Sequence, residues 1–396
     1  MRSYSENVGL EQVNTMAVKR VNVQRIFQLL YWERELTQME IKKYLQLSSP
    51  TITQVLQTLR RMDILEDGAE VESSGGRKPR CIAFNYRAAC SVGVEIRRHS
   101  MEIVIVQLDG TVLSSAVERA NFDNTAQYWK HMNACIRKLI DTTQGVHNVL
   151  GVGIAFPGEV SFGNHIIERA TVFGLENVPL DDIRRHFDFN VYIENGASTA
   201  GFGAAWRDRD LQDAVYIIVT DDGVAGTIIL NNRIFRGCGK AGAFGHMTLD
   251  PHGKHCFCGG QGCWSAYCAL SNLTALTDGS LNMFFEKVKD GDAECCGAWD
   301  TYLNNFALAL KTIILSLDLN VVIGGKLAPY LENYLDVLRA KVQRHPALKT
   351  KIPNIMIDQL DGNAIAVGAA MIFVSRLVSG ETDLRDVFGE EESERK

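Results

Sequence analysis

The feature that most restricts how this 396-residue chain can fold is a short run that contains three of its ten cysteines. The run reads Cys256-Phe257-Cys258-Gly259-Gly260-Gln261-Gly262-Cys263, and its glycines permit a tight loop that turns several thiols toward one point. The N-terminus, MRSYSENVGLEQVN, lacks the apolar segment of a signal peptide. A secreted disulfide framework is therefore disfavoured, and we expect a cytoplasmic protein whose clustered cysteines bind metal.

A histidine upstream of this run completes a possible ligand set. His246, Cys256, Cys258 and Cys263 offer one nitrogen and three sulfurs, which match a closed, tetrahedral, structural Zn²⁺ site. Four protein ligands leave no open position for catalysis. His252, His255 and Cys268 are alternative ligands, and the simpler alternative is a set of reduced, buried cysteines beside an unrelated histidine.

Charge is distributed unevenly along the chain, whose formal net charge is −6. Residues 1–86 hold 12 Lys and Arg against 10 Asp and Glu, whereas residues 17–62 alone hold 8 against 3. A basic N-terminal module on an acidic body fits a DNA-binding head. The sequence has no stretch of roughly 20 apolar residues, so no membrane partner is expected.

Three helices are predicted in this N-terminal module. Periodic apolar residues indicate the first from about Val18 to Trp32. The second starts at Thr37, where Thr37-Gln38-Met39-Glu40 forms a capping box, and Ile41, Tyr44 and Leu45 are expected to be buried. The third starts at Ser48 or Ser49, with Pro50 tolerated in its first turn.

The outer face of the third helix is predicted to be polar, which is typical of the recognition helix of a helix-turn-helix. The strands 64–67 and 81–84 then flank a glycine-rich, basic loop that would form a wing. The alternative is a protein-interaction module with a solvated basic loop. The expected DNA contacts are Ser49, Thr51, Thr53, Gln54, Gln57 and Arg61 on the helix, where Thr58 is also placed outward, and Arg77, Lys78 and Arg80 on the wing.

The remaining chain has α/β texture, with strands expected at 92–96, 101–108, 112–113, 149–155, 191–193 and 215–219. We expect a winged helix-turn-helix in residues 1–86, followed by two α/β lobes. The first lobe would hold residues 87–198, joined by the C-terminal residues 373–396. The second would hold residues 199–372 and the zinc-binding loop.

Five motifs make the chain resemble the ROK family of repressors and sugar kinases, specifically its repressor branch. They are Ser74-Gly75-Gly76-Arg77-Lys78-Pro79, Gly151-Val152-Gly153-Ile154-Ala155-Phe156-Pro157-Gly158, Ala241-Gly242-Ala243-Phe244-Gly245-His246, the cysteine run, and Val322-Ile323-Gly324-Gly325. The resemblance implies a two-lobed, actin-like, sugar-kinase-like body that forms homo-oligomers. It also implies a structural zinc that orders the loop beside a sugar pocket.

The groups that the resemblance assigns to phosphoryl transfer are missing. The family's first phosphate loop is an acidic residue followed by Gly-Gly-Thr, but here the segment reads Glu95-Ile96-Arg97-Arg98-His99-Ser100. The second loop carries Asp221 and Asp222, which would repel a triphosphate. The catalytic Asp of the family's Asn-Asp pair is Gly196, after Asn195. We therefore expect no enzymatic activity.

The family's sugar-binding set is also depleted, because Ala243 and Ser265 replace two glutamates. Asn195 and His246 remain as candidate ligand-binding residues, so either the effector is less polyhydroxylated or the site is vestigial. The leading hypothesis is a repressor of carbohydrate-related genes, a homodimer or dimer of dimers on a two-fold symmetric double-stranded DNA operator, tuned by a small, sugar-like effector. The alternatives are a ROK-type sugar kinase with an added head and a regulator controlled by a partner protein.

Overall fold

The computed structural model describes residues 15–70, 80–161, 165–208, 211–350, 352–358 and 363–389. The chain divides into two compact units, a head of residues 1–89 and 374–396 and a body of residues 90–373. Arg77 and Lys78 of the predicted wing lie outside the described residues. Within the described ranges, no helix has both the length and the apolar character needed to cross a membrane.

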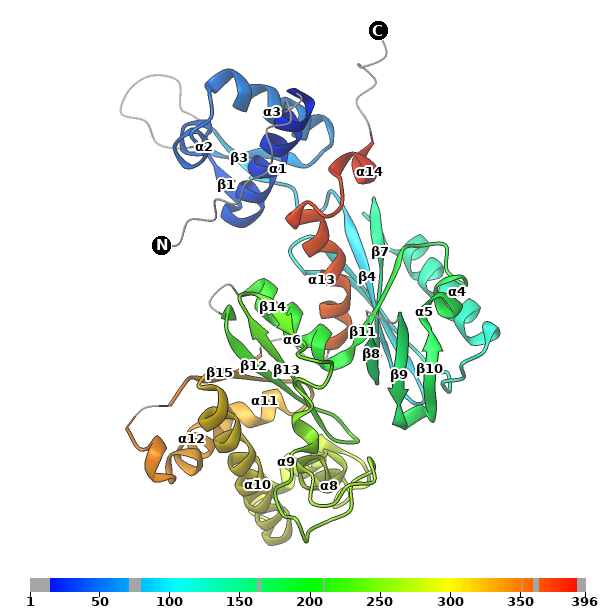
Figure 1. The fold of residues 1–396 in the computed structure, drawn as a ribbon, viewed down its shortest axis with the longest axis vertical. Coiled ribbons are helices and arrows are strands. Elements are labelled where there is room, and N and C mark those ends of the chain that lie inside the picture. Colours follow the sequence, from blue (N-terminus) through cyan, green and yellow to red (C-terminus); the bar gives the residue numbers. More distant parts are fainter. Residues whose placement is uncertain are drawn as a thin grey trace. The chain divides into compact units, whose positions relative to one another are not determined.

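The N-terminal segment of the head contains the helices α1, α2 and α3 and a small antiparallel sheet (Figure 1). The helices are α1 (Thr15–Glu33), α2 (Gln38–Leu45) and α3 (Ser49–Arg61). The sheet has the order β1-β3-β2, with β1 (Glu35–Leu36), β2 (Leu65–Glu70) and β3 (Arg80–Phe84). The helices and strands share one core, which includes Phe27, Leu30, Ile52, Leu59 and Phe84.

Local capping sets the boundaries of α2 and α3. Thr37 and Glu40 form the reciprocal capping box that the sequence predicts. Gln46 ends α2 in the left-handed conformation, with φ of 54°, and this reverses the chain toward α3. Ser48 is the N-cap of α3, and Pro50 occupies the first turn, where its missing N–H leaves no hydrogen bond unmade.

Two side chains in these helices differ from the sequence-based expectation. Tyr44 of α2 is 58% exposed rather than buried, because Ile41 alone fills that face of the short helix. Thr58 of α3 is buried rather than outward-facing, and its hydroxyl donates to the carbonyl of Gln54. Periodicity misplaces both residues because each lies at the edge of its helix's apolar stripe.

The C-terminal segment of the head packs on α1. Gln24 of α1 donates to the carbonyls of Leu377 and Val378, and Gln28 donates to Val378 at 2.6 Å. These carbonyls lie in the last turn of α13 (Ala364–Ser379), where intrahelical donors run out. The glutamines therefore cap that helix end, and α14 (Leu384–Phe388) follows it.

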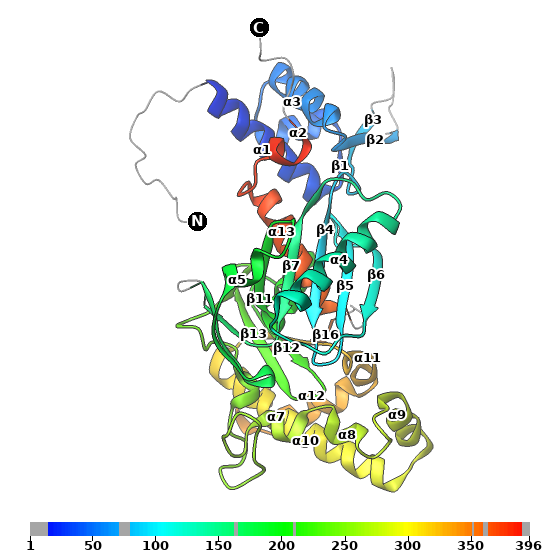
Figure 2. The same cartoon turned by 90° about the vertical axis from the view of Figure 1, so that its right-hand side faces the viewer.

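The first lobe of the body is built on a five-stranded sheet of order β11-β7-β4-β5-β6. Helix α4 (Ala126–Thr142) covers one face through Trp129 and Met132 (Figure 2). A Cβ on Gly93 or Gly153 would collide with the backbone of α13, so these glycines allow α13 to pack closely on the same sheet. The strands are β4 (Cys90–Ile96), β5 (Met101–Gln107), β6 (Val112–Glu118), β7 (Val149–Phe156) and β11 (Val191–Asn195).

A small antiparallel sheet of order β10-β9-β8 and two short helical segments complete this lobe. They are β8 (Glu159–Ser161), β9 (Ile166–Ala170), η1 (Thr171–Phe173), β10 (Leu175–Pro179) and α5 (Leu180–Arg184).

The second lobe contains a five-stranded sheet of order β14-β13-β12-β15-β16. Successive side chains of its central strand point to opposite, buried faces of the sheet. Val215 and Ile217 join the core that includes α10 (Ala293–Leu317), whereas Tyr216 joins the core with α6 (Gly196–Arg207). The strands are β12 (Ala214–Val219), β13 (Val224–Leu230), β14 (Arg233–Phe235), β15 (Asn320–Gly324) and β16 (Ile355–Ile357). The remaining helices are η3 (Phe244–His246), α7 (Trp264–Cys268), α8 (Ser271–Thr274), α9 (Leu281–Asp290), α11 (Ala328–Leu331), η4 (Glu332–Tyr334), α12 (Leu335–Gln343) and η5 (Pro346–Leu348).

The predicted fold class is confirmed: an N-terminal head of three helices and a strand pair is followed in the chain by a two-lobed α/β body. The predicted domain boundaries stay a prediction. The structure adds that α13 packs on the first-lobe sheet through Ala366 and Ala369, while residues 374–396 group with the head.

Candidate functional site

The polar face of α3 presents the residues that the sequence analysis proposes for DNA contact. Ser49, Thr53, Gln54, Gln57 and Arg61 are exposed, and Thr51 is half-buried. Some of these side chains already have partners within the head, since the Thr53 hydroxyl donates to the Ser49 carbonyl and accepts from Gln38. Gln54 and Gln57 are exposed amides on adjacent turns, which is the chemistry that reads an adenine edge.

The described base of the wing carries one of the three predicted cations. Arg80 begins β3 and forms ion pairs with Glu70 at 3.1 Å and with Asp67 at 3.8 Å. Its side chain is 61% exposed, so these pairs stabilise the strand pair only weakly. The same guanidinium remains accessible to a phosphate.

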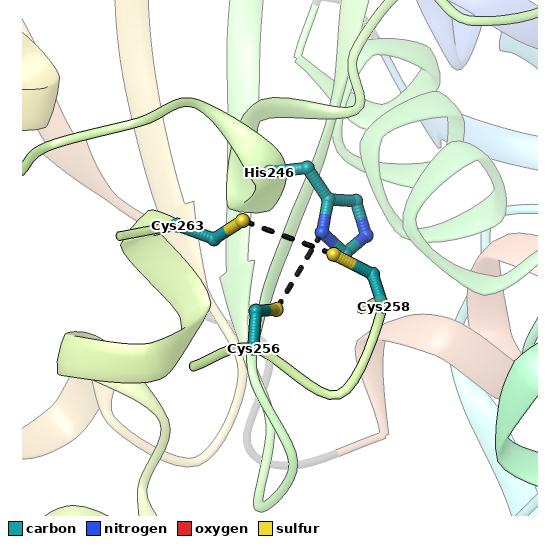
Figure 3. A group of neighbouring side chains, drawn as sticks. All are labelled: His246, Cys256, Cys258 and Cys263. Carbon is teal, nitrogen blue, oxygen red and sulfur yellow. Dashed lines mark hydrogen bonds between the residues drawn. The ribbon is translucent and has the colours of Figure 1, made fainter. Parts of the chain in front are cut away.

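The four predicted metal ligands converge in the second lobe (Figure 3). His246 ends η3, Cys256 and Cys258 lie in the following loop, and Cys263 is the N-cap residue of α7. Backbone hydrogen bonds hold the loop shut, among them Cys256 N–H to the Gly260 carbonyl at 2.9 Å. Gly262 is required here, because its φ is +74° and a Cβ would collide with the Asp250 carbonyl.

The distances within this cluster suit a tetrahedral ion. The four ligand atoms lie within 4.8 Å of one another, with Cys258 Sγ 3.8 Å from Cys263 Sγ and Cys256 Sγ 3.8 Å from His246 Nδ1. Zinc about 2.3 Å from sulfur and about 2.05 Å from nitrogen separates two sulfurs by about 3.8 Å and a sulfur from a nitrogen by about 3.5 Å. The cluster can therefore hold a metal ion with little movement.

Burial shapes the protonation of the cluster. It raises the pKa of the Cys263 thiol to about 12 and lowers the pKa of His246, against the opposing charge of Glu159. A neutral imidazole is the form that binds metal, whereas a buried thiol becomes a thiolate only beside a cation. Cys268, an alternative ligand in the sequence analysis, lies elsewhere, buried with its thiol directed at the Tyr302 carbonyl.

The segment that matches the family's first phosphate loop is filled by an ion-pair cluster. Arg97 pairs with Glu95 at 2.7 Å and also with Glu102, whose side chain is 7% exposed. Burial lowers the pKa of Arg97, but hydrogen bonds and the charges of both glutamates outweigh it, so the net shift is upward. The guanidinium is thus held as a cation by two carboxylates of its own lobe.

The segment that matches the second phosphate loop is a closed turn with a cation partner. Thr220 N–H donates to the Gly223 carbonyl at 2.8 Å, and Asp221 pairs with Lys326 at 2.9 Å. Asp222 is exposed at the tip. The loop presents the carboxylates of Asp221 and Asp222 at its exposed tip.

The side chain of Asn195, a predicted ligand-binding residue, forms hydrogen bonds with nearby backbone groups. Its side-chain oxygen caps α6 by accepting from Ala197 and Ser198, and its amide donates to the Gly158 carbonyl at 2.8 Å. Gly196 begins α6 immediately afterwards. The side chain of Asn195 therefore positions the start of α6.

Two ion pairs that the sequence analysis missed join the lobes beside this residue. Glu194 of β11 pairs with Arg236, which follows β14, at 2.5 Å, and Glu159 of β8 pairs with Lys240. Burial raises the pKa of Glu194, although Arg236 and the Asn195 N–H lower it. An acidic residue directly after the run Val191-Tyr192-Ile193 was the available signal, since a buried carboxylate requires a partner.

The positions of the family's two other sugar-binding glutamates are occupied differently. The Ser265 hydroxyl is buried and bridges the N–H and carbonyl of Val224 at 3.0 and 3.2 Å. Ala243 precedes η3 and offers no polar group. His246, the second predicted ligand-binding residue, lies near Glu159, and its Nδ1 faces Cys256.

Comparisons with known proteins cover most of the chain. The model described as "ROK family" matches residues 91–376. The xylose repressor of Bacillus subtilis (strain 168) is 24% identical over 263 residues, covering 65% of this chain and 67% of the relative. The DNA-binding transcriptional dual regulator NagC of Escherichia coli (strain K12) is 23% identical over 398 residues, covering 93% and 95%.

Solved structures share the fold. A ROK family transcriptional regulator, a homologue of the E. coli MLC protein, superposes with a TM-score of 0.74 at 19% identity and covers 94% of this chain and 100% of its own. A ROK family glucokinase from Streptomyces griseus, in complex with glucose and AMPPNP, has a TM-score of 0.61 at 24% identity. That match covers 72% of this chain and 99% of its own.

Proposed function

The chain belongs to the ROK family, and from this premise we propose that it is a DNA-binding transcriptional regulator, a repressor of carbohydrate-related genes with a non-catalytic body. The observation that carries the proposal is the head, in which a capped α3 exposes a polar face beside an antiparallel strand pair. Matches to transcriptional regulators that extend over more than 90% of the chain support it.

In the proposed DNA interface, some residues contact bases and others contact phosphates. Gln54 and Gln57 would read base edges in the major groove, while Ser49, Thr51, Thr53 and Arg61 would position α3 on the backbone. Arg80, with Arg77 and Lys78 of the wing, would neutralise phosphates. Two heads of a homodimer, or of a dimer of dimers, would engage a two-fold symmetric operator.

The body would serve as the effector and oligomerisation module. We propose that His246, Cys256, Cys258 and Cys263 bind one structural Zn²⁺, because their distances and donor types fit it and all four positions are filled by protein. A small, sugar-like effector would act beside Asn195 and His246, where Glu194–Arg236 and Glu159–Lys240 connect the lobes. Ligand that competes for these pairs would change the lobe arrangement.

A sugar kinase with an added head is disfavoured by the internal ion pairs at both phosphate loops and by Gly196. Control by a partner protein is the other alternative. In that case no sugar tested would change operator binding, whereas a stable complex with the partner protein would change it.

The test is selection of bound duplexes from genomic fragments with the full-length protein. We expect a preferred two-fold symmetric site, bound with an affinity that falls steeply as salt rises. Gln54→Ala should weaken binding to that site about 5- to 150-fold and relax base preference at one position, as expected for the loss of one bidentate base contact worth about 1–3 kcal/mol. Gln144→Ala, an exposed glutamine of the body, is the matched control. Enrichment of no sequence would refute the proposal.

A further inference from the structure

A second group of metal-ligating side chains lies on the first lobe, on elements that do not contribute to the His246 cluster. Glu118 is the last residue of β6, and His131 and Cys135 lie four residues apart on α4. Residues at that spacing share one helix face. The three ligand atoms lie within 4.8 Å of one another. We propose that Glu118, His131 and Cys135 form a second, exchangeable binding site for a divalent transition metal.

The separations match those of a tetrahedral ion. His131 Nε2 is 3.4 Å from Glu118 Oε1 and 3.6 Å from Cys135 Sγ. Zinc bonded at about 2.05 Å to nitrogen and oxygen and at about 2.3 Å to sulfur separates nitrogen from oxygen by about 3.3 Å and nitrogen from sulfur by about 3.5 Å. His131 therefore already lies at metal-bridging distance from both partners, and all three ligand atoms lie within 4.8 Å of one another.

The donor set selects the class of metal. One thiolate, one imidazole and one carboxylate suit Zn²⁺ and related borderline ions, whereas Mg²⁺ and Ca²⁺ prefer oxygen ligands alone. Three protein ligands leave a fourth position for water. The His131 and Glu118 side chains are 47% and 43% exposed, so the ion can exchange with solvent.

A metal ion bound at this site would connect strand β6 to helix α4. Strand β6 is the edge of the first-lobe sheet, and α4 covers that sheet through Trp129 and Met132. An ion shared by Glu118 and the two α4 ligands would fasten the edge strand to the covering helix. Metal added to the protein should accordingly stabilise the folded state by mass action.

The experiment uses the full-length protein with its tightly bound metal in place. After dialysis against a moderate chelator, calorimetric titration with ZnCl₂ should show one additional ion per chain. Titration with CoCl₂ should give a thiolate-to-cobalt absorption band. Cys135→Ser should abolish that band, and His131→Gln and Glu118→Gln should each weaken affinity by at least about tenfold, since even an outer-shell partner of a metal site contributes about 10–100-fold.

Two control variants separate this site from the others. Cys238→Ser removes an exposed thiol elsewhere and should change nothing. Cys258→Ser should lower the content of tightly bound metal while the additional site still binds cobalt. The proposal is overturned if no additional ion binds, or if Cys135→Ser and His131→Gln leave the stoichiometry and the cobalt band as they are in the parent protein.

Discussion

The His–Cys cluster of the second lobe and the segments that match the family's phosphate loops differ in how completely they present the groups that their functions require. The cluster presents a complete donor set, His246, Cys256, Cys258 and Cys263, within 4.8 Å. The phosphate loops present side chains that pair with one another, Arg97 with Glu95 and Asp221 with Lys326. The first region has the donors that a metal ion needs, whereas the charged groups of the second region are already paired within the protein.

The ion pairs of the second region favour stability over phosphate binding. A phosphate-binding loop keeps backbone donors unpaired and tolerates like charges until the ligand arrives, and this costs stability. In this protein Glu102 and Glu194 are buried, and each has an arginine partner. The Glu194–Arg236 and Glu159–Lys240 ion pairs connect the two lobes of this protein. In a kinase, the bound substrates would connect them.

The largest effect should follow from breaking the complete cluster. Cys258→Ser removes a soft ligand, and we expect zinc content to fall from about one ion per chain to nearly none. If the cluster binds zinc as proposed, metal binding would supply much of the folding free energy of the loop. Each lost kcal/mol lowers the melting temperature by about 2–4 °C in a body of this size. Elemental analysis and thermal melting measure both quantities.

Cys238→Ser provides the comparison, because Cys238 is exposed and lies outside the cluster. It should retain zinc and melt with the parent protein. Full zinc occupancy in Cys258→Ser would show that the ligand set is wrong, and His252 and His255 would then be tested as replacements.

An intermediate effect should follow from breaking a lobe-connecting pair. Arg236→Met leaves the buried Glu194 without its cation. Loss of one partner from a buried pair costs about 3–5 kcal/mol, and the 40% exposure of Arg236 reduces this because water can reach the site. Chemical denaturation measures the free energy of unfolding. Lys240→Met, which breaks the more exposed pair, is the comparison. If both variants lowered the free energy of unfolding equally, the buried Glu194–Arg236 pair would not be the more important for stability.

The same variant should change how stability depends on pH. Burial already raises the pKa of Glu194 in the folded protein, so between the ordinary glutamate pKa and this raised value the native state retains a proton that the unfolded chain has released. The contribution of this proton to the free energy of unfolding is fully present below the ordinary glutamate pKa. It is lost as pH rises through the raised pKa of the folded protein. Removing Arg236 raises that value further, so the loss should extend to higher pH. Glu194→Gln with Arg236→Met should lack this dependence.

The sequence predicted the parts of the site whose geometry is local. The capping box at Thr37 and the convergence of Cys256, Cys258 and Cys263 depend on neighbours within ten residues. The Glu194–Arg236 pair joins a residue of β11 to one that follows β14, 42 positions apart, and no periodicity encodes it. Thr58 and Tyr44 were misassigned for a related reason, because the edge of an apolar stripe is decided by what packs against it.

The smallest effect is expected from restoring the missing base. Gly196→Asp should fold, because a Cβ there lies 3.5 Å from the nearest Ile365 methyl group, and a carboxylate in the first turn of α6 faces favourable backbone donors. Sugar-dependent ATP turnover should nevertheless stay at background, as in the parent protein. A positioned base contributes about 10²–10⁴-fold only when the phosphates are held in line. Here Asp221 opposes them, and Arg97 is already bound to Glu95 and Glu102. Turnover with glucose, N-acetylglucosamine and N-acetylmannosamine, alongside calorimetric titration with ATP, measures the outcome. A rise of about a hundredfold or more would mean that the phosphate loops still work and that the base alone was lost.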